Sequence, residues 1–197
     1  LSYMRCIPNM TLMAPADENE CRQMLYTGFL HDGPAAVRYP RGKGPGASID
    51  KTMTALEIGK AQTVITGKDI AIVAVGSMVT PATIVGQQLG ATVVNLRFIK
   101  PLDEQLLSKL ASSHRYLVTI EENAVEGGAG SAIDEYLASM GIEIPLLNLG
   151  IPDQFIEHGT REECLAACGL NTSGIMASIK DFLAKQACDN PQNTLAF

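Results

Sequence analysis

The sequence predicts an α/β protein with an open, mostly parallel sheet that carries one antiparallel edge strand. The first observation is that short apolar runs alternate with amphipathic segments through residues 57–187. The second is that residues 1–41 have the order strand, helix, strand, which is the unit of a parallel sheet. Apolar residues make up 46% of the chain and charged residues 18%, so a substantial core can form.

The first strand is expected at residues 10–15, a short apolar run that ends at a proline. Asp17 then caps a helix that runs to about Leu30, and Glu20 three residues later completes a variant of the capping box. The second strand is expected at residues 35–39. Together these elements predict a β-α-β unit.

Residues 1–41 are too few to form a parallel sheet alone, because such sheets are buried on both faces. We therefore expect them to be the incomplete end of a larger domain. Since the chain does not begin with Met, we also expect it to be an excised or processed piece of a longer protein. Residues 42–56 are rich in glycine and lack apolar periodicity, which is typical of an interdomain linker.

A second, complete domain is expected at residues 57–187. It opens with strands at 58–65 and 69–76, and the sequence TGKD between them predicts a hairpin. A helix follows, with Thr80 as its N-cap and Pro81 as its first residue.

The remaining elements of the second domain continue the alternation of strands and helices. We expect strands at 92–99, 116–123 and 145–150, a helix from Asp103, a helix that ends at Met140, a short helix that begins at a Thr160–Glu163 capping box, and a last helix at 172–186. The tail, residues 188–197, has no periodicity and is expected to be frayed.

Composition excludes several function classes. The net charge of −6 and the pI near 5.0 argue against a nucleic-acid partner. No apolar run approaches the roughly 18 residues that span a membrane. The five cysteines form no CxxC pair and indicate reduced thiols in a cytosol-like compartment. Cys164 and Cys168 lie four residues apart and could share a metal, but no further His or Cys partner lies nearby, so buried thiols are the preferred interpretation.

Arg38 and Arg41 are the strongest candidate binding residues, since they follow a predicted strand of the parallel sheet. A guanidinium group offers a planar fork that matches phosphate or carboxylate oxygens, and Gly42 lets the backbone approach a ligand closely. The alternative is a structural ion pair with an acid such as Asp17 or Glu20. The residues alone favour that ion pair.

A second candidate site combines Glu121 and Glu122 with the glycine-rich stretch at 127–130. A glycine-rich turn into a helix can cradle a phosphate, but the match to G-x-G-x-x-G is poor and two carboxylates would repel the anion. This disfavours a stand-alone phosphate- or nucleotide-binding domain. Close packing of helix on strand, with the carboxylate pair engaged at an interface, is the preferred interpretation.

The three histidines, His31, His114 and His158, lie at predicted helix ends and have no Ser or Cys nucleophile beside them. We therefore interpret them as structural. Nothing in residues 57–197 composes a catalytic site.

Several stretches carry a resemblance to a known family. Residues 1–42, with IPNMTLMAP and DGPAAVRYPRG, resemble the closing part of the pyrimidine-binding domain of the 1-deoxy-D-xylulose-5-phosphate synthases, a branch of the transketolase superfamily. The stretches NLRFIKPLDEQLL, VTIEENAVEGGAGSAIDEYL and LNLGIPDQFIEHGTREE resemble the C-terminal domain of the same family, in the same order. The resemblance covers about residues 1–186.

The resemblance implies a homodimeric transferase that depends on thiamine diphosphate and Mg²⁺. Such an enzyme condenses pyruvate with D-glyceraldehyde 3-phosphate, releases carbon dioxide and feeds isoprenoid, thiamine and pyridoxal synthesis. The cofactor supplies the carbanion chemistry. Arg41 matches the family arginine that binds the phosphate of the aldehyde substrate, and Arg38 is its neighbour. The expected location is the cytoplasm, or the plastid if the source is a plant.

The chain lacks the family's G-D-G motif for diphosphate and magnesium, the glutamate that activates the cofactor, and the G-x-T-H-Q-G stretch. We therefore expect the isolated chain to be inactive and to bind neither thiamine diphosphate nor Mg²⁺. Two alternatives remain open: a dimerisation or interaction module without a ligand of its own, and the beta subunit of a 2-oxo acid dehydrogenase.

Overall fold

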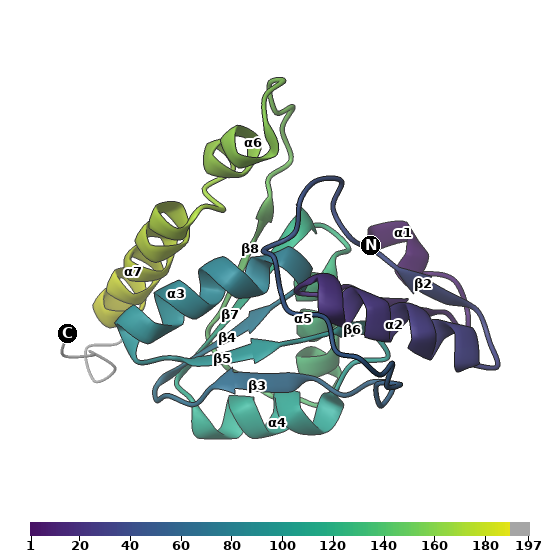
Figure 1. Ribbon diagram of the computed structural model, residues 1–197. Coiled ribbons are helices and arrows are strands. Elements are labelled where there is room, and N and C mark those ends of the chain that lie inside the picture. The colour runs from purple at the N-terminus through teal and green to yellow at the C-terminus, as the bar shows by residue number, and fades with distance from the viewer. Residues whose placement is uncertain (190–197) are drawn as a thin grey trace.

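The computed structural model describes residues 1–189 (Figure 1). Its helices are α1 (Ser2–Arg5), α2 (Glu18–Leu30), α3 (Val79–Leu89), α4 (Glu104–Ser113), α5 (Ala129–Ser139), α6 (Arg161–Ala167) and α7 (Thr172–Asp189), with a 3₁₀ turn η1 (Gly76–Met78) before α3. The strands are β1 (Thr11–Met13), β2 (Ala35–Val37), β3 (Gln62–Ile65), β4 (Ile70–Ala74), β5 (Thr92–Asn95), β6 (Phe98–Lys100), β7 (Tyr116–Ala124) and β8 (Leu146–Ile151). The predicted frayed tail lies outside the described residues, apart from its first two residues, which end α7.

The main sheet has five strands in the order β3-β5-β4-β7-β8. Its strands β5, β4, β7 and β8 are parallel, and β3 pairs antiparallel with β5 at one edge. The predicted fold class, a mostly parallel sheet with one antiparallel edge strand, is therefore confirmed.

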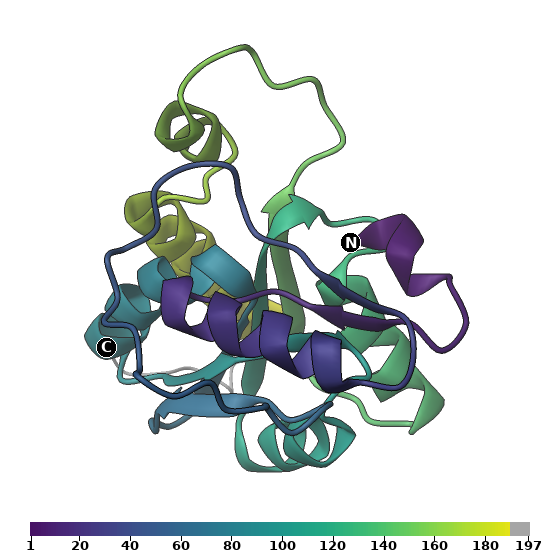
Figure 2. The ribbon, with the colours of Figure 1, turned by 45° about the vertical axis from the view of Figure 1, so that its right-hand side comes forward.

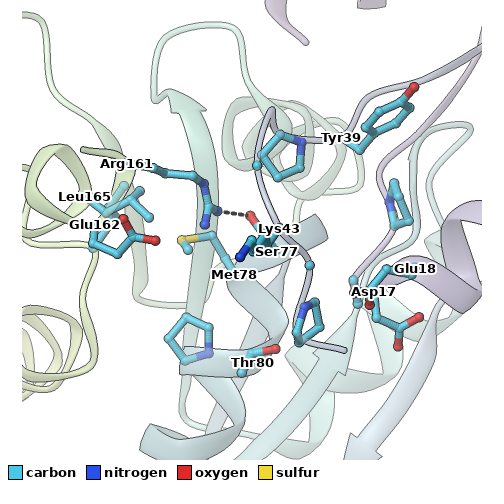
Figure 3. Close-up of a pocket in the computed structure, with 18 of the residues that line it drawn as sticks. Asp17, Glu18, Tyr39, Lys43, Ser77, Met78, Thr80, Arg161, Glu162 and Leu165 are labelled. Atoms are coloured by element: carbon cyan, nitrogen blue, oxygen red, sulfur yellow. Dashed lines mark hydrogen bonds between the residues drawn. The ribbon is translucent and has the colours of Figure 1, made fainter. Parts of the chain in front are cut away.

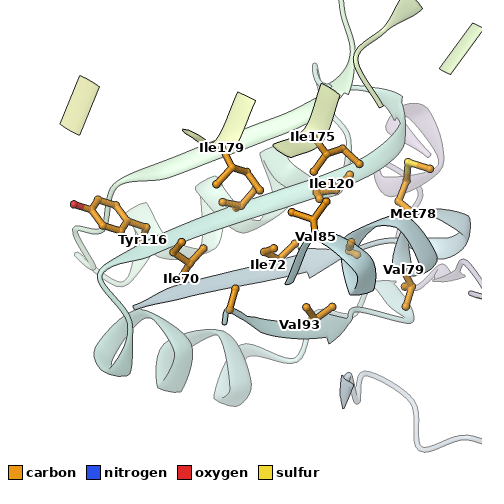
Figure 4. Packing of buried hydrophobic residues seen from close by; sticks show 14 of the residues in the cluster. Ile70, Ile72, Met78, Val79, Val85, Val93, Tyr116, Ile120, Ile175 and Ile179 are labelled. Atoms are coloured by element: carbon orange, nitrogen blue, oxygen red, sulfur yellow. The ribbon is translucent and has the colours of Figure 1, made fainter. Parts of the chain in front are cut away.

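Helices cover both faces of this sheet (Figure 1). The side chains of β4 alternate: Ile70 and Ile72 pack against α3 and α7, whereas Ala71 and Val73 pack against α4 and α5. Figure 4 shows the first of these clusters, in which Ile175 of α7 lies over the sheet. Burial on both faces explains why β4 is an unbroken apolar run.

The predicted hairpin between residues 58–65 and 69–76 is wrong. β5 lies between β3 and β4, and the connecting turn instead bonds to the loop before β5, with Lys68 N–H donating to the Gly90 carbonyl at 3.0 Å. β4 is buried on both faces and takes parallel neighbours on both sides, whereas β3 is mostly exposed and takes the edge.

The apolar run 92–99, predicted as one strand, is divided between two sheets. It breaks at Arg97, whose φ of 58° redirects the chain. β5 stays in the main sheet, and β6 pairs antiparallel with β1 in a smaller sheet of order β2-β1-β6. β1 and β2 form the parallel pair that was predicted. The third strand of their sheet is β6, which follows β5 of the main sheet in sequence.

Two of the three predicted N-caps, Asp17 and Thr160, cap their helices, and the helix expected from Asp103 starts there. Asp17 accepts from Glu20 N–H at 2.8 Å, Asp103 caps α4, and the Thr160 box caps α6. The helix predicted to start at Pro81, with Thr80 as its N-cap, begins two residues earlier, at Val79, because η1 leads directly into it.

The capping box predicted for α2 is incomplete because the Glu20 carboxylate has other partners. It accepts from Ala16 N–H at 2.7 Å, from the Asn95 amide at 2.9 and 3.0 Å, and from Arg97 Nε at 2.6 Å. This buried cluster joins the start of α2 to the point where β5 turns into β6.

Candidate functional site

Arg38 follows β2 and is tied down at its backbone and at its side chain. Its N–H donates to the Met13 carbonyl at 2.8 Å, which prolongs the pairing of β2 with β1. Its Nη2 donates to the Glu122 carbonyl at 2.9 Å, and its Nη1 lies 3.8 Å from Glu122 Oε2. The expected structural ion pair of Arg38 is therefore present, but its acid is Glu122, because Asp17 caps α2 and Glu20 binds Arg97.

Arg41 is exposed, and no other residue within 1–189 forms a hydrogen bond or ion pair with its side chain. The turn that follows depends on Gly42, whose φ of 151° is unfavourable for residues with a side chain. The structure thus separates the two predicted site residues: Arg38 is neutralised inside the chain, and Arg41 is left open.

The chain on either side of Arg41 borders a cavity of about 550 Å³. The wall formed by residues 39–40 and 42–45, without Arg41 itself, faces the start of α2, η1, α6 and the start of α7 (Figure 3). Figure 2 shows this segment as a wide loop that leaves β2 and passes α6 before it returns along α2. Ser77 and Arg161 also line the cavity, and Figure 3 shows the Arg161 side chain directed toward Ser77.

Glu122 organises the polar groups beside this cavity. Its carboxylate accepts from Ser77 Oγ at 2.6 Å and from Arg161 Nε and Nη2 at 3.0 and 2.6 Å. Arg161 Nη2 also donates to Ser77 Oγ at 2.8 Å (Figure 3). With Arg38, this cluster joins the end of β2, η1, β7 and the first residue of α6.

The Glu122 carboxylate is held in its charged form. Burial alone would raise its pKa, but hydrogen bonds from Arg161 and Ser77, together with the charges of Arg161 and Arg38, bring the pKa below its ordinary value. The same hydrogen bond raises the pKa of Arg161. Sequence reasoning missed Ser77 and Arg161, because no local pattern connects them with Glu122, which is 39 residues before Arg161.

Glu121 occupies the place that a phosphate would take at the glycine-rich turn. Its buried carboxylate accepts from the N–H groups of Ala129 and Gly130, at 2.9 and 2.8 Å, at the start of α5. A Cβ on Gly128 would lie 2.3 Å from Glu121 Oε2, and one on Gly130 would lie 2.7 Å from Thr119 Oγ1. The predicted close packing of helix on strand is confirmed, and the two carboxylates are engaged within this chain.

The buried position of Glu121 predicts a specific pH dependence. Burial raises its pKa above the ordinary value of 4.5, and this outweighs the hydrogen bonds from Gly130 and Ala129. A raised pKa in the folded state contributes stability below pH 4.5 that is lost as the pH rises through the folded pKa. We therefore subtract the free energy of unfolding of Glu121→Gln from that of the wild type. This difference is expected to decrease as the pH is raised from 4.5 to 7.

Urea titrations of the two proteins across this range measure that difference. Carboxylates with a lowered pKa, such as Glu122, stabilise the fold at high pH, and this contribution is lost as the pH falls through their folded pKa. Because the wild type and Glu121→Gln both contain these carboxylates, their contribution cancels in the difference. A difference that stays constant or grows with pH contradicts the assignment.

His31 and His114 lie at helix ends and His158 precedes the Thr160-capped helix, as predicted. His31 follows α2 and its Nε2 lies 3.2 Å from Thr11 Oγ1; His114 follows α4 and its Nε2 lies 2.8 Å from Thr92 Oγ1. His158 is exposed in the loop before α6.

The cysteines are free thiols in the part of the chain that the structure describes. Cys164 and Cys168 are only partly buried, contrary to the expectation of buried thiols. Across residues 1–189, no three His, Cys, Asp or Glu side chains are grouped so that they could hold a metal ion. Within the same residues, no helix is both long and apolar enough to cross a membrane.

Two family models match the chain in sequence. The transketolase C-terminal domain matches residues 59–175, and the transketolase pyrimidine binding domain matches residues 1–46. The chain is 56% identical over 193 residues to the 1-deoxy-D-xylulose-5-phosphate synthase of Methylococcus capsulatus, which covers 98% of this chain and 30% of that protein. It is 58% identical over 185 residues to the protein of the same name from Methylobacillus flagellatus, with 94% and 30% covered.

Solved structures agree with these matches. A split-gene transketolase, solved as an inactive beta4 tetramer, superposes with a TM-score of 0.83 at 31% identity, covering 93% of this chain and 61% of that one. The transketolase of Campylobacter jejuni has the same fold, with a TM-score of 0.66 at 17% identity and 91% and 27% covered. This chain spans about 30% of the length of the curated relatives. From the sheet order and the match over residues 59–175, the chain belongs to the transketolase family and contains its C-terminal domain.

Proposed function

We propose that this chain is the C-terminal part of a 1-deoxy-D-xylulose-5-phosphate synthase. The complete enzyme condenses pyruvate with D-glyceraldehyde 3-phosphate to 1-deoxy-D-xylulose 5-phosphate and releases carbon dioxide. The observation that carries this proposal is the 56–58% identity to proteins of that name over nearly the whole chain. The alternative of a 2-oxo acid dehydrogenase beta subunit is not better supported.

Arg41 is the residue proposed to bind the substrate phosphate. It follows the carboxyl end of a parallel strand, where ligands of α/β sheets collect, and its side chain is exposed beside a glycine turn. A free guanidinium group can place two N–H donors on phosphate oxygens. Arg38, which is bound to Glu122, contributes positive charge at the same strand end.

The cofactors proposed for the complete enzyme are thiamine diphosphate and Mg²⁺. Within residues 1–189, no three His, Cys, Asp or Glu side chains are grouped as ligands of a metal ion. We propose that the rest of the protein supplies the magnesium–diphosphate site, and that the isolated chain neither binds the cofactors nor turns over.

The proposed organisation follows from the same reasoning. Residues 1–41 end the pyrimidine-binding domain, 42–56 connect the domains, and 57–187 form the C-terminal domain. The complete protein is proposed to be a cytoplasmic homodimer.

A second role, self-association without activity, is favoured by one observation. The split-gene relative, which matches 93% of this chain, forms a tetramer that is described as inactive. Sedimentation of the isolated chain tests this: association without turnover supports the role, whereas a monomer at micromolar concentration contradicts it.

The activity is tested with a chimera. The matching C-terminal 30% of the Methylococcus capsulatus enzyme is replaced by this chain, and product formation and carbon dioxide release are measured with both substrates. We expect activity within about tenfold of that enzyme, and none from the same protein truncated before the junction. A folded, cofactor-loaded chimera without product contradicts the proposal.

A further inference from the structure

Hydrogen bonds and ion pairs hold the segment between Arg38 and Gly46 at its two ends, and Gly44 also packs against the Glu18 side chain. Within residues 1–189, no hydrogen bond or ion pair involves residues 39–45. At the far end, the N–H groups of Gly46 and Ala47 donate to the Glu18 carboxylate at 2.8 and 3.1 Å. At the near end the anchor is Arg38. The position of everything between, including Arg41, depends on how firmly these ends are held.

The side-chain anchor of Arg38 is Glu122. Both contacts of the Arg38 guanidinium group that the structure contains go to this residue, one to its carbonyl and one to its carboxylate. The Arg38 side chain is 35% exposed and that of Glu122 is 12% exposed, so the pair is sheltered on the Glu122 side. Such a pair resists screening better than one on the open surface.

Glu122 is itself held rigidly. Arg161 binds its carboxylate with two N–H groups, and Ser77 donates a third hydrogen bond. A bidentate arginine contact fixes orientation as well as distance. Without the charge of Glu122, Arg38 and Arg161 would both lose the carboxylate that they share.

We infer that Glu122 is a positioning residue for phosphate binding: it holds Arg38, and through Arg38 it sets where Arg41 is presented. This inference rests on the proposed function. It assigns Glu122 no contact with the substrate. Ser77 and Arg161 serve the same purpose by fixing the Glu122 carboxylate, which places part of the control of the phosphate site in the C-terminal domain.

The experiment is steady-state kinetics of the complete, cofactor-loaded enzyme with Glu122→Gln, an almost isosteric change that removes the charge. We expect KM for D-glyceraldehyde 3-phosphate to rise roughly 5- to 30-fold, with KM for pyruvate and kcat within about twofold. Ser77→Ala, which removes a single hydrogen bond from the same carboxylate, is expected to shift KM in the same direction by a smaller factor. Glu126→Gln, an exposed acid in the turn after β7, is the matched control and is expected to change neither constant.

A double-mutant cycle separates positioning from general support of the fold. If Glu122 acts through Arg38, Glu122→Gln changes KM for the aldehyde by less than about twofold in an Arg38→Ala background. Additive effects, or equal rises in both KM values, overturn the inference. Should Glu122→Gln fail to fold, the same cycle with Ser77→Ala decides by the same criteria.

The Arg41→Ala variant shows whether a negative result contradicts the positioning role of Glu122 or the proposed phosphate role of Arg41. If Arg41→Ala raises KM for the aldehyde but Glu122→Gln and Ser77→Ala do not, the positioning role is wrong and the phosphate role stands. If Arg41→Ala changes nothing, the proposed phosphate role is wrong, and the inference falls with it.

Discussion

Replacing Arg41 with alanine in the complete enzyme is expected to lower kcat/KM for D-glyceraldehyde 3-phosphate by roughly 10- to 150-fold. A charged hydrogen bond contributes about 1.5–3 kcal/mol, which corresponds to that range. The effect should fall on KM for the phosphorylated aldehyde, and KM for pyruvate should stay within about twofold. Initial rates with each substrate varied in turn measure the two constants.

The unphosphorylated substrate analogue D-glyceraldehyde provides the control. Because it lacks the phosphate, its kcat/KM should differ by less than about twofold between the wild type and Arg41→Ala. Arg41→Lys keeps the charge but removes the planar fork, so we expect an intermediate loss with the phosphorylated aldehyde. Equal losses with both aldehydes would show that Arg41 supports the site in another way.

Replacing Glu20 with alanine is expected to lower the free energy of unfolding by about 3 kcal/mol. The substitution removes a partner of Arg97, whose side chain is 21% exposed, and of the Asn95 amide, which is buried. Buried polar groups that lose their partner are more costly than the hydrogen bond itself is favourable. Urea unfolding of the isolated chain, followed by circular dichroism, measures the change.

Glu57→Ala is the matched control for this measurement. Glu57 is exposed, and its side chain forms no hydrogen bond or ion pair within residues 1–189, so its removal should change the free energy by less than about 0.5 kcal/mol. A loss below about 1 kcal/mol for Glu20→Ala would mean that Arg97 and Asn95 find other partners.

The alternation of apolar runs predicted the fold class because a strand that is buried on both faces of a sheet is apolar at nearly every position. The runs around β4 and β7 are apolar since those strands lie in the middle of the main sheet. Caps at Asp17, Asp103 and Thr160 were also predictable, because each bond joins residues three positions apart.

Which strands pair with one another was harder to predict from the sequence. The run 92–99 is apolar throughout, whether it forms one strand or two, and only the contact of β6 with β1 shows that it serves two sheets. The hairpin predicted between β3 and β4 does not form. A short turn makes a hairpin possible, but the burial of β4 on both faces favours parallel neighbours.

For the candidate site, too, local features were predictable from the sequence and long-range contacts were not. The sequence by itself determined that Arg38 and Arg41 follow a strand of a parallel sheet, and that Gly42 permits a sharp turn after them. Only the tertiary structure decided that Arg38 is held by Glu122 while Arg41 stays open. The physical reason is distance along the chain: Glu122 lies 84 residues after Arg38, and no local preference records a charge pair that forms only when β2, β7 and α6 are brought together.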